Sequence, residues 1–96
     1  MIRHRFYVGT TRDGRHVRHD DVQECLVNAF AGWTMFRAFG AWHDARDNEV
    51  REDSIVYECL TENGNIDGRK VAAQCRDLAQ QACVLWTFET VKGEFV

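Results

Sequence analysis

The segment from Gly40 to Ser54 carries the densest set of side chains that could do chemistry. It holds one Trp, one His, two Arg and five carboxylates, and Glu58 follows closely. Apolar runs typical of strands flank the segment, so we expect it to connect two strands as a β-hairpin. Such a connection needs only a few polar residues, and this one is longer and more charged than a turn requires. The hairpin is therefore the first candidate for a functional site.

The candidate ligand-binding residues lie at the two ends of this hairpin and on the first predicted strand. A tryptophan ring can stack on a planar ligand, an arginine guanidinium matches a phosphate or carboxylate, and Glu and Ser can hydrogen-bond. The leading hypothesis is a small non-enzymatic protein that binds a small anionic, nucleotide-like ligand or a host protein. The residues assigned to this site are Trp42, Arg51, Glu52, Ser54, Arg5 and Tyr7.

The same segment permits two other interpretations. In the first, the protein is a small enzyme with Glu52 or His43 as acid–base and Ser54 nearby, or with Glu52 and Glu58 as a carboxylate pair. No nucleophile-elbow motif accompanies Ser54. In the second, the segment is purely structural or part of an interaction module. Arg46 and Arg51 then merely stiffen the hairpin by pairing with its carboxylates Glu49, Glu52 and Asp53.

Metal and cofactor sites are not predicted. His16 and His19 stand three residues apart and could reach one metal ion, but a zinc site needs three or four ligands. The surrounding segment is typical of a charged, solvated loop that leads into a helix. No Walker-type loop or GxGxxG sequence is present. We therefore expect no metal and no cofactor.

Size and composition predict one domain over residues 1–96. The chain is 45% hydrophobic and 11% aromatic, which suffices for a packed core, and its net charge is −3.

The charge distribution argues against nucleic acid as a partner. Arginines and histidines concentrate in residues 1–19, but the net charge of the whole chain is negative. No apolar run is long enough to span a membrane. The four cysteines lack metal-site spacing, so we expect reduced thiols and a cytoplasmic protein.

Hydrophobic periodicity predicts the order β-α-β-β-α-β. Such an order favours an α+β, ferredoxin-like sandwich, in which a four-stranded antiparallel sheet carries two helices on one face. Strand patterns cover residues 2–10, 34–43, 54–61 and 83–91, and helix patterns cover residues 19–30 and 67–82. Turns are expected at Asp13-Gly14 and Asn63-Gly64.

The second and fourth predicted strands carry apolar residues on both faces. Phe36 and Trp42 alternate with Met35 and Phe39 on the second strand. Strands covered on both sides have this pattern, and two helices can cover only one side of the sheet. A second copy of the chain is the simplest cover for the other side, so we expect a homodimer, with tolerated surface aromatics as the alternative.

The chain resembles a family of short bacterial and phage proteins that share a domain of unknown function. The resemblance lies in Phe6-Tyr7-Val8-Gly9, Asp13-Gly14, Gly40-Ala41-Trp42 and Arg51-Glu52-Asp53-Ser54, and it covers nearly the whole chain. It implies a ferredoxin-like fold and directs attention to the Gly-x-Trp and Arg-Glu-x-Ser ends of the hairpin. The family implies no activity. Phage proteins of this size often bind host proteins or sequester nucleotide signals, which favours the binding hypothesis.

Overall fold

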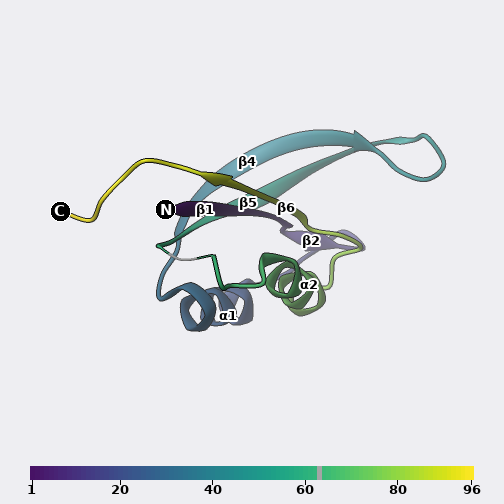
Figure 1. Ribbon diagram of the computed structural model, residues 1–96. Coiled ribbons are helices and arrows are strands. Elements are labelled where there is room, and N and C mark those ends of the chain that lie inside the picture. The colour runs from purple at the N-terminus through teal and green to yellow at the C-terminus, as the bar shows by residue number, and fades with distance from the viewer. Residues whose placement is uncertain (63) are drawn as a thin grey trace.

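The computed structural model describes residues 1–62 and 64–96. Its main sheet has four antiparallel strands in the order β4-β5-β1-β6, and two helices cover one face of this sheet (Figure 1). The predicted α+β class is confirmed, and the arrangement is compatible with a ferredoxin-like fold. The elements are β1 (Ile2–Gly9), α1 (Asp20–Phe30), β4 (Thr34–His43), β5 (Glu49–Thr61), α2 (Gly68–Leu78) and β6 (Leu85–Thr90).

A small hairpin between β1 and α1 adds to the predicted order. Its strands, β2 (Thr11–Arg12) and β3 (Arg15–His16), pair with each other and are separate from the main sheet. Asp13 and Gly14 form the predicted turn, with φ of 51° and 76°. Glycine adopts this left-handed conformation without steric cost, and Asp tolerates it better than most residues. The other predicted turn, Asn63-Gly64, includes residue 63 and lies outside the described residues.

Both helices begin and end where local chemistry favours it. Asp20 and Asp21 lie in the first turn of α1, where the positive end of the helix dipole stabilises their negative charge. Helix α1 begins one residue after the expected start and ends at Phe30 as expected, where Ala31 adopts a left-handed conformation and donates its N–H to the carbonyl of Val27. Asp67 caps α2 by accepting from the backbone N–H of Lys70 at 3.1 Å.

Helix α2 and strand β6 are shorter than the sequence predicts. Helix α2 ends at Leu78, and β6 begins at Leu85, two residues after the expected start. Gly68 is the first residue of α2, and the indole ring of Trp86 packs so closely against it that a β-carbon would lie 2.4 Å from the ring.

The core lies between the helices and the helix-facing side of the sheet. The largest fully buried side chains come from β1, α1, β5 and α2: Tyr57, Phe6, Leu26, Val8, Val22, Val56, Cys59 and Cys75.

Cys59 and Cys75 are buried and all four cysteines are free thiols, as expected for reduced cysteines. None of the helices in residues 1–62 and 64–96 is long and apolar enough to cross a membrane.

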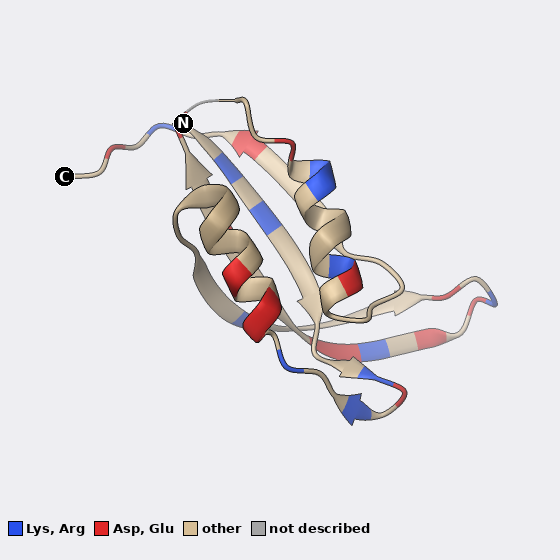
Figure 2. Cartoon of the chain, turned by 90° about the horizontal axis from the view of Figure 1, so that it is seen from below, with Lys and Arg blue, Asp and Glu red and all other residues tan. Residues whose placement is uncertain are grey.

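The charged hairpin is mostly strand, which corrects the predicted boundary at Ser54. Strand β5 starts at Glu49, and its ladder with β4 continues to the pair His43 and Glu49. The connecting loop is therefore only residues 44–48. Asp44 closes it by accepting the backbone N–H groups of Arg46 and Asn48, both at 2.9 Å. Figure 1 shows this ribbon extending well beyond the two helices, and Figure 2 shows the acidic and basic residues along it.

Candidate functional site

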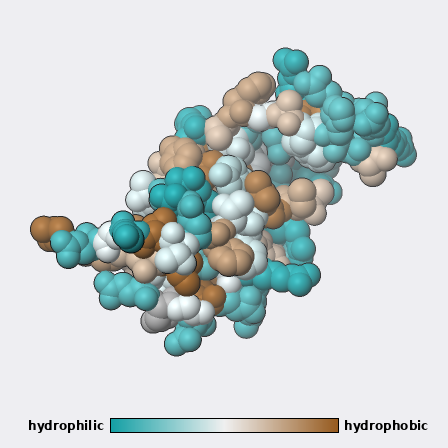
Figure 3. Space-filling view, turned by 45° about the horizontal axis from the view of Figure 1, so that its top comes forward, coloured by the Kyte–Doolittle hydropathy of each residue, from teal (hydrophilic) through white to brown (hydrophobic). Residues whose placement is uncertain are grey.

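The register of the sheet divides the predicted site residues between two faces. Side chains alternate along a strand, and directly paired residues share a face. Ile55 is buried beneath the helices, so Ser54 and Glu52 point to the opposite, open face. Trp42, Tyr7 and Arg5 also lie on the open face by their pairing. Five of the six predicted residues therefore share one face, part of which Figure 3 shows as apolar patches between hydrophilic residues.

Trp42 and Glu52 form the best-defined contact of this group. The indole Nε1 of Trp42 donates a hydrogen bond to Glu52 Oε1 at 3.2 Å. Gly40 is the direct cross-strand partner of Glu52, and no atom lies within 4 Å of the place where its β-carbon would be. This empty position leaves the carboxylate approachable from the β4 side.

A second glycine makes room on the β1 side. Gly9 is buried, and a β-carbon there would lie 2.3 Å from Gln81 Oε1 and 3.4 Å from Glu52 Oε2. Gln81 is held in this place because its Nε2 donates to the carbonyls of Thr11 and Ala79, both at 2.9 Å. The two glycines thus let Glu52 and Gln81 lie against the sheet.

A hollow of about 180 Å³ forms where these groups meet the loop before β6. Arg12 also lines it, but its guanidinium lies 3.7 Å from the carboxylate of Asp13. Of the two carboxylates in the hollow, Asp13 is paired with Arg12. Glu52 has no arginine partner among the described residues. The lining residues are Thr11, Arg12, Asp13, Trp42, Glu52, Gln81, Ala82 and Cys83.

Arg51 is not part of this site, which corrects the sequence-based assignment. It pairs with Ala41 and lies on the face opposite Glu52. Its Nε donates to Glu49 Oε1 at 3.0 Å, so its charge is already balanced by a neighbour. An anion bound beside Trp42 and Glu52 would not reach this guanidinium, because adjacent residues of a strand point to opposite faces.

The structure does not bring together the residues of the proposed catalytic pairs. His43 lies on the face opposite Glu52 and Ser54, and its Nδ1 contacts Asp47 Oδ1 at 2.9 Å. Ser54 pairs with Ala38, five residues from His43, which corresponds to about 17 Å along the strand. Glu52 and Glu58 are separated by about 20 Å on the same strand. A Ser54–His43 dyad, a Glu52–His43 pair and a Glu52–Glu58 pair are therefore all excluded within one chain.

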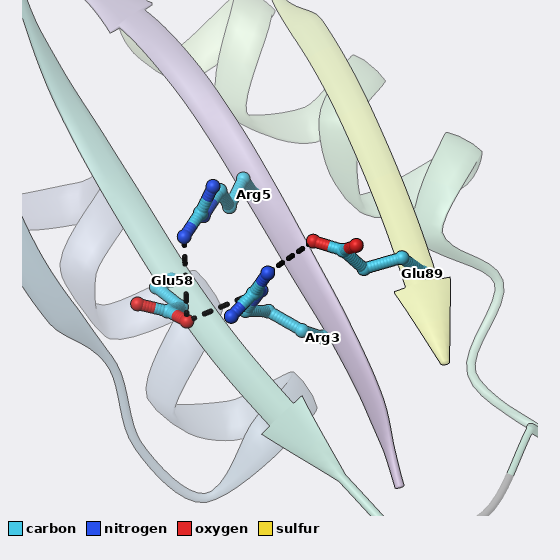
Figure 4. A network of polar contacts seen from close by, with 4 residues as sticks. All are labelled: Arg3, Arg5, Glu58 and Glu89. Atoms are coloured by element: carbon cyan, nitrogen blue, oxygen red, sulfur yellow. Dashed lines mark hydrogen bonds and ion pairs between the residues drawn. The ribbon is translucent and has the colours of Figure 1, made fainter. Parts of the chain in front are cut away.

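Arg5 lies in a paired network rather than in a free anion site. Figure 4 shows Arg3 between Glu58 and Glu89, with Arg5 beside Glu58. Arg3 Nε is 3.4 Å and Arg5 Nη2 is 3.9 Å from Glu58 Oε1, and Arg3 also hydrogen-bonds Glu89. That hydrogen bond lowers the pKa of Glu89. Each arginine therefore has a carboxylate within ion-pair distance, while the Nε of Arg3 and of Arg5 is buried without a hydrogen-bond partner among the described residues.

Sequence reasoning missed a buried polar group around His19. We expected His19 in a solvated loop, but it is only 8% exposed. Its Nε2 lies 2.8 Å from the carbonyl of Gly9 and its Nδ1 lies 2.8 Å from the hydroxyl of Tyr57. A carbonyl can only accept, so Nε2 carries the proton and Nδ1 accepts from Tyr57. Gln23 in turn donates to the Tyr57 oxygen at 3.3 Å. Burial lowers the pKa of His19, which favours the neutral ring.

The predicted basic patch of residues 1–19 is smaller than its composition implies. His4 is 4% exposed on the helix side, where Trp86 Nε1 donates to its Nδ1 at 3.1 Å. Burial lowers the pKa of His4 as well. The alternation of β1 could have revealed this position, because His4 falls in register with Phe6 and Val8.

Comparison with known proteins gives a structural neighbour. No family model matches the chain, and no curated protein matches its sequence. A solved structure described as a phage SAM lyase in the apo state superposes with a TM-score of 0.66. The match covers 92% of this chain and 78% of that chain, with 12% sequence identity. At this identity, the similarity shows that the two chains share a fold.

The neighbour is an enzyme, which counts against the leaning of the sequence analysis towards a non-enzymatic protein. That expectation was based on the density of binding-type side chains and on the absence of a catalytic motif. The neighbour is a lyase, and its chain has the same fold without close sequence similarity.

Proposed function

We propose that the protein is a small enzyme in which Glu52 is the acid–base residue. Its substrate would be SAM or a related small molecule that carries a positively charged sulfur. The observation that carries this proposal is the carboxylate of Glu52, oriented by Trp42 at 3.2 Å and accessible between two glycine positions. The shared fold with a phage SAM lyase supports the substrate class.

The charges around the hollow favour a cationic ligand centre. Arg51 faces away, Arg5 is paired with Glu58, and Arg12 is paired with Asp13. The carboxylate of Glu52 can therefore stabilise a nearby positive charge and accept a proton from the substrate. The electron-rich face of Trp42 attracts a cation as well. The anionic ligand expected from the sequence finds no unpaired guanidinium here.

The proposal extends to the assembly of the protein. Phe36 and Leu85 lie on the open face and are 43% and 57% exposed. Packing these side chains against a second copy would remove apolar surface from water. We keep the homodimer as part of the proposal, together with the cytoplasmic location and the membership in the Gly-x-Trp, Arg-Glu-x-Ser family.

Incubation with SAM tests the proposed activity directly. The loss of SAM and the appearance of products are followed by liquid chromatography and mass spectrometry for the wild type, Glu52→Gln and Glu49→Gln. Loss of a general acid–base residue should reduce turnover by about 100-fold or more. Glu49→Gln is the matched control, because Glu49 lies on the same strand and binds Arg51. Intact SAM after incubation with wild type, or full activity in Glu52→Gln, would refute the proposal.

A further inference from the structure

A second cavity lies on the helix-facing side of the β4–β5 ribbon, away from Glu52. Its volume is about 320 Å³, which is at the lower end of the range of ligand pockets, roughly 300–1,000 Å³. Three parts of the chain enclose it: the β2–β3 hairpin, the start of α1 and the ribbon itself. Figure 1 shows the ribbon extending past the helices.

The wall of this cavity combines an apolar surface with a satisfied polar group. Met35, Ile55 and Val17 contribute apolar side chains. Tyr57 and His19 also line it, and their polar atoms hydrogen-bond to each other. These hydrogen bonds leave the imidazole of His19 with no lone pair for a ligand, because Nε2 donates to Gly9. The cavity therefore suits a ligand with an apolar body.

Two opposite charges lie at the cavity without pairing with each other. Arg37 and Asp53 both line it and share the helix-facing side, since Arg37 pairs with Ile55 and Asp53 pairs with Phe39. Neither side chain forms an ion pair or hydrogen bond with the residues in 1–62 and 64–96. Diagonal neighbours of this kind have Cα atoms about 7–8 Å apart. His16, which is exposed, is the remaining titratable group at the rim.

We propose that this cavity binds a free α-amino acid with an apolar side chain of medium size. The guanidinium of Arg37 would hold the carboxylate of the amino acid in a bidentate contact, and Asp53 would accept hydrogen bonds from its ammonium group. An α-amino acid presents both charges on one carbon, which matches two opposite charges on neighbouring strands. The apolar side chain would lie against Met35 and Tyr57.

The site is separate from the proposed catalytic hollow and does not depend on it. Asp53 and Glu52 are adjacent on β5 and therefore point to opposite faces of the sheet. Leucine carries no charged sulfur, so its binding does not require Glu52. Failure of one proposal therefore leaves the other intact.

Calorimetric titration with L-leucine, L-leucine methyl ester and N-acetyl-L-leucine tests the site. The ester lacks the negative charge and the acetylated form lacks the positive charge, while the side chain is unchanged. We expect L-leucine to bind, and each analogue to bind about tenfold more weakly or worse. Absence of leucine binding at millimolar concentrations, or equal binding of all three compounds, would overturn the proposal.

Variants of Arg37 and Asp53 test which charged group of leucine each residue binds. Arg37→Gln should lose the preference for leucine over its methyl ester, and Asp53→Asn should lose the preference for leucine over the acetylated form. Both residues are exposed, so the variants should fold. Arg46→Gln and Glu24→Gln remove the same charges from exposed positions outside the cavity, and Glu52→Gln removes the acid of the hollow. All three should bind leucine like the wild type, and unaltered binding in Arg37→Gln and Asp53→Asn would contradict the assignment.

Discussion

Trp42 and Glu52 meet diagonally across the β4–β5 ladder, not as direct partners. Trp42 is opposite Val50 and Glu52 is opposite Gly40, yet the indole Nε1 reaches Glu52 Oε1 at 3.2 Å. The missing side chain of Gly40 leaves this diagonal path open. The ring therefore orients one oxygen of the carboxylate while the other lies toward Gly9.

This contact predicts different effects for two substitutions of Trp42. Trp42→Phe keeps an aromatic face but removes the hydrogen-bond donor, so we expect lower kcat for SAM with a modest change in KM. Trp42→Ala removes the face too and should raise KM by a further factor of about ten, in line with a cation–π contribution of roughly 1–2 kcal/mol. Steady-state kinetics on SAM measures both values, and identical kinetics for the two variants would contradict the prediction.

Cys83 offers a probe of the hollow that does not depend on turnover. It is exposed and lines the hollow with Trp42 and Glu52. Burial raises the pKa of Cys59 and of Cys75 to about 12, so these thiols should react slowly. Iodoacetamide should therefore modify Cys83 first, and SAM should slow that reaction. Mass spectrometry of the modified peptides locates the label, with Cys83→Ser as control. Fast labelling of Cys83 that SAM leaves unchanged would place the ligand elsewhere.

Gly68 and Gly40 predict opposite effects of an added methyl group. In Gly68→Ala the new β-carbon would lie 2.4 Å from the rigid ring of Trp86. We expect the free energy of unfolding to fall by about 1–3 kcal/mol, as for other overpacked sites. Gly40→Ala meets open space and has no positive φ, so stability should stay the same or rise by about 0.4–1 kcal/mol. Urea denaturation measures both, and equal stabilities would contradict the packing of Trp86 on α2.

The buried His19 predicts loss of stability at mildly acidic pH. Burial holds its pKa in the folded protein below the ordinary value of 6.5. As pH falls through 6.5, the unfolded chain takes up a proton that the folded chain does not, so the free energy of unfolding decreases. Each unit of pKa difference corresponds to about 1.4 kcal/mol. His4 should contribute in the same direction.

Urea denaturation between about pH 5 and pH 8, the range in which histidines titrate, tests this prediction. His19→Gln should flatten the dependence on pH, whereas His16→Gln, which changes an exposed ring, should leave it unchanged. A wild-type stability that stays constant or rises as the pH is lowered would show that His19 is not kept neutral by burial.

The open face predicts a dimer that one charge can disrupt. Phe36 and Leu85 expose 43% and 57% of their surface on this face. Light scattering at tens of micromolar should give twice the mass of 11.1 kDa for the wild type. Phe36→Asp should shift the mass towards the monomer, because an unpaired charge at an apolar interface is costly. Phe39→Asp is the control, since Phe39 is exposed on the other face. A wild type that is monomeric at this concentration would contradict the predicted homodimer.

The sequence alone determined the class of fold and most of the elements. The alternation in β1 and the 3.6-residue periodicity of α1 and α2 depend on local burial, so they are visible in the chain. The cap at Asp67 and the turn at Asp13-Gly14 are also local chemistry. The density of charged and aromatic residues between Gly40 and Ser54 is also visible in the chain, and it identified the region that contains Trp42 and Glu52.

Only the tertiary structure decided which of these residues share a site. The face of each side chain depends on the register between strands, and a shift of one residue reverses it. Arg51 and His43 therefore left the candidate site, whereas Gly9 and Gln81 entered it from β1 and the loop before β6. The burial of His19 likewise depends on Tyr57, 38 positions away in the chain. No local pattern reports such a contact, because it forms only when the helix packs on the sheet.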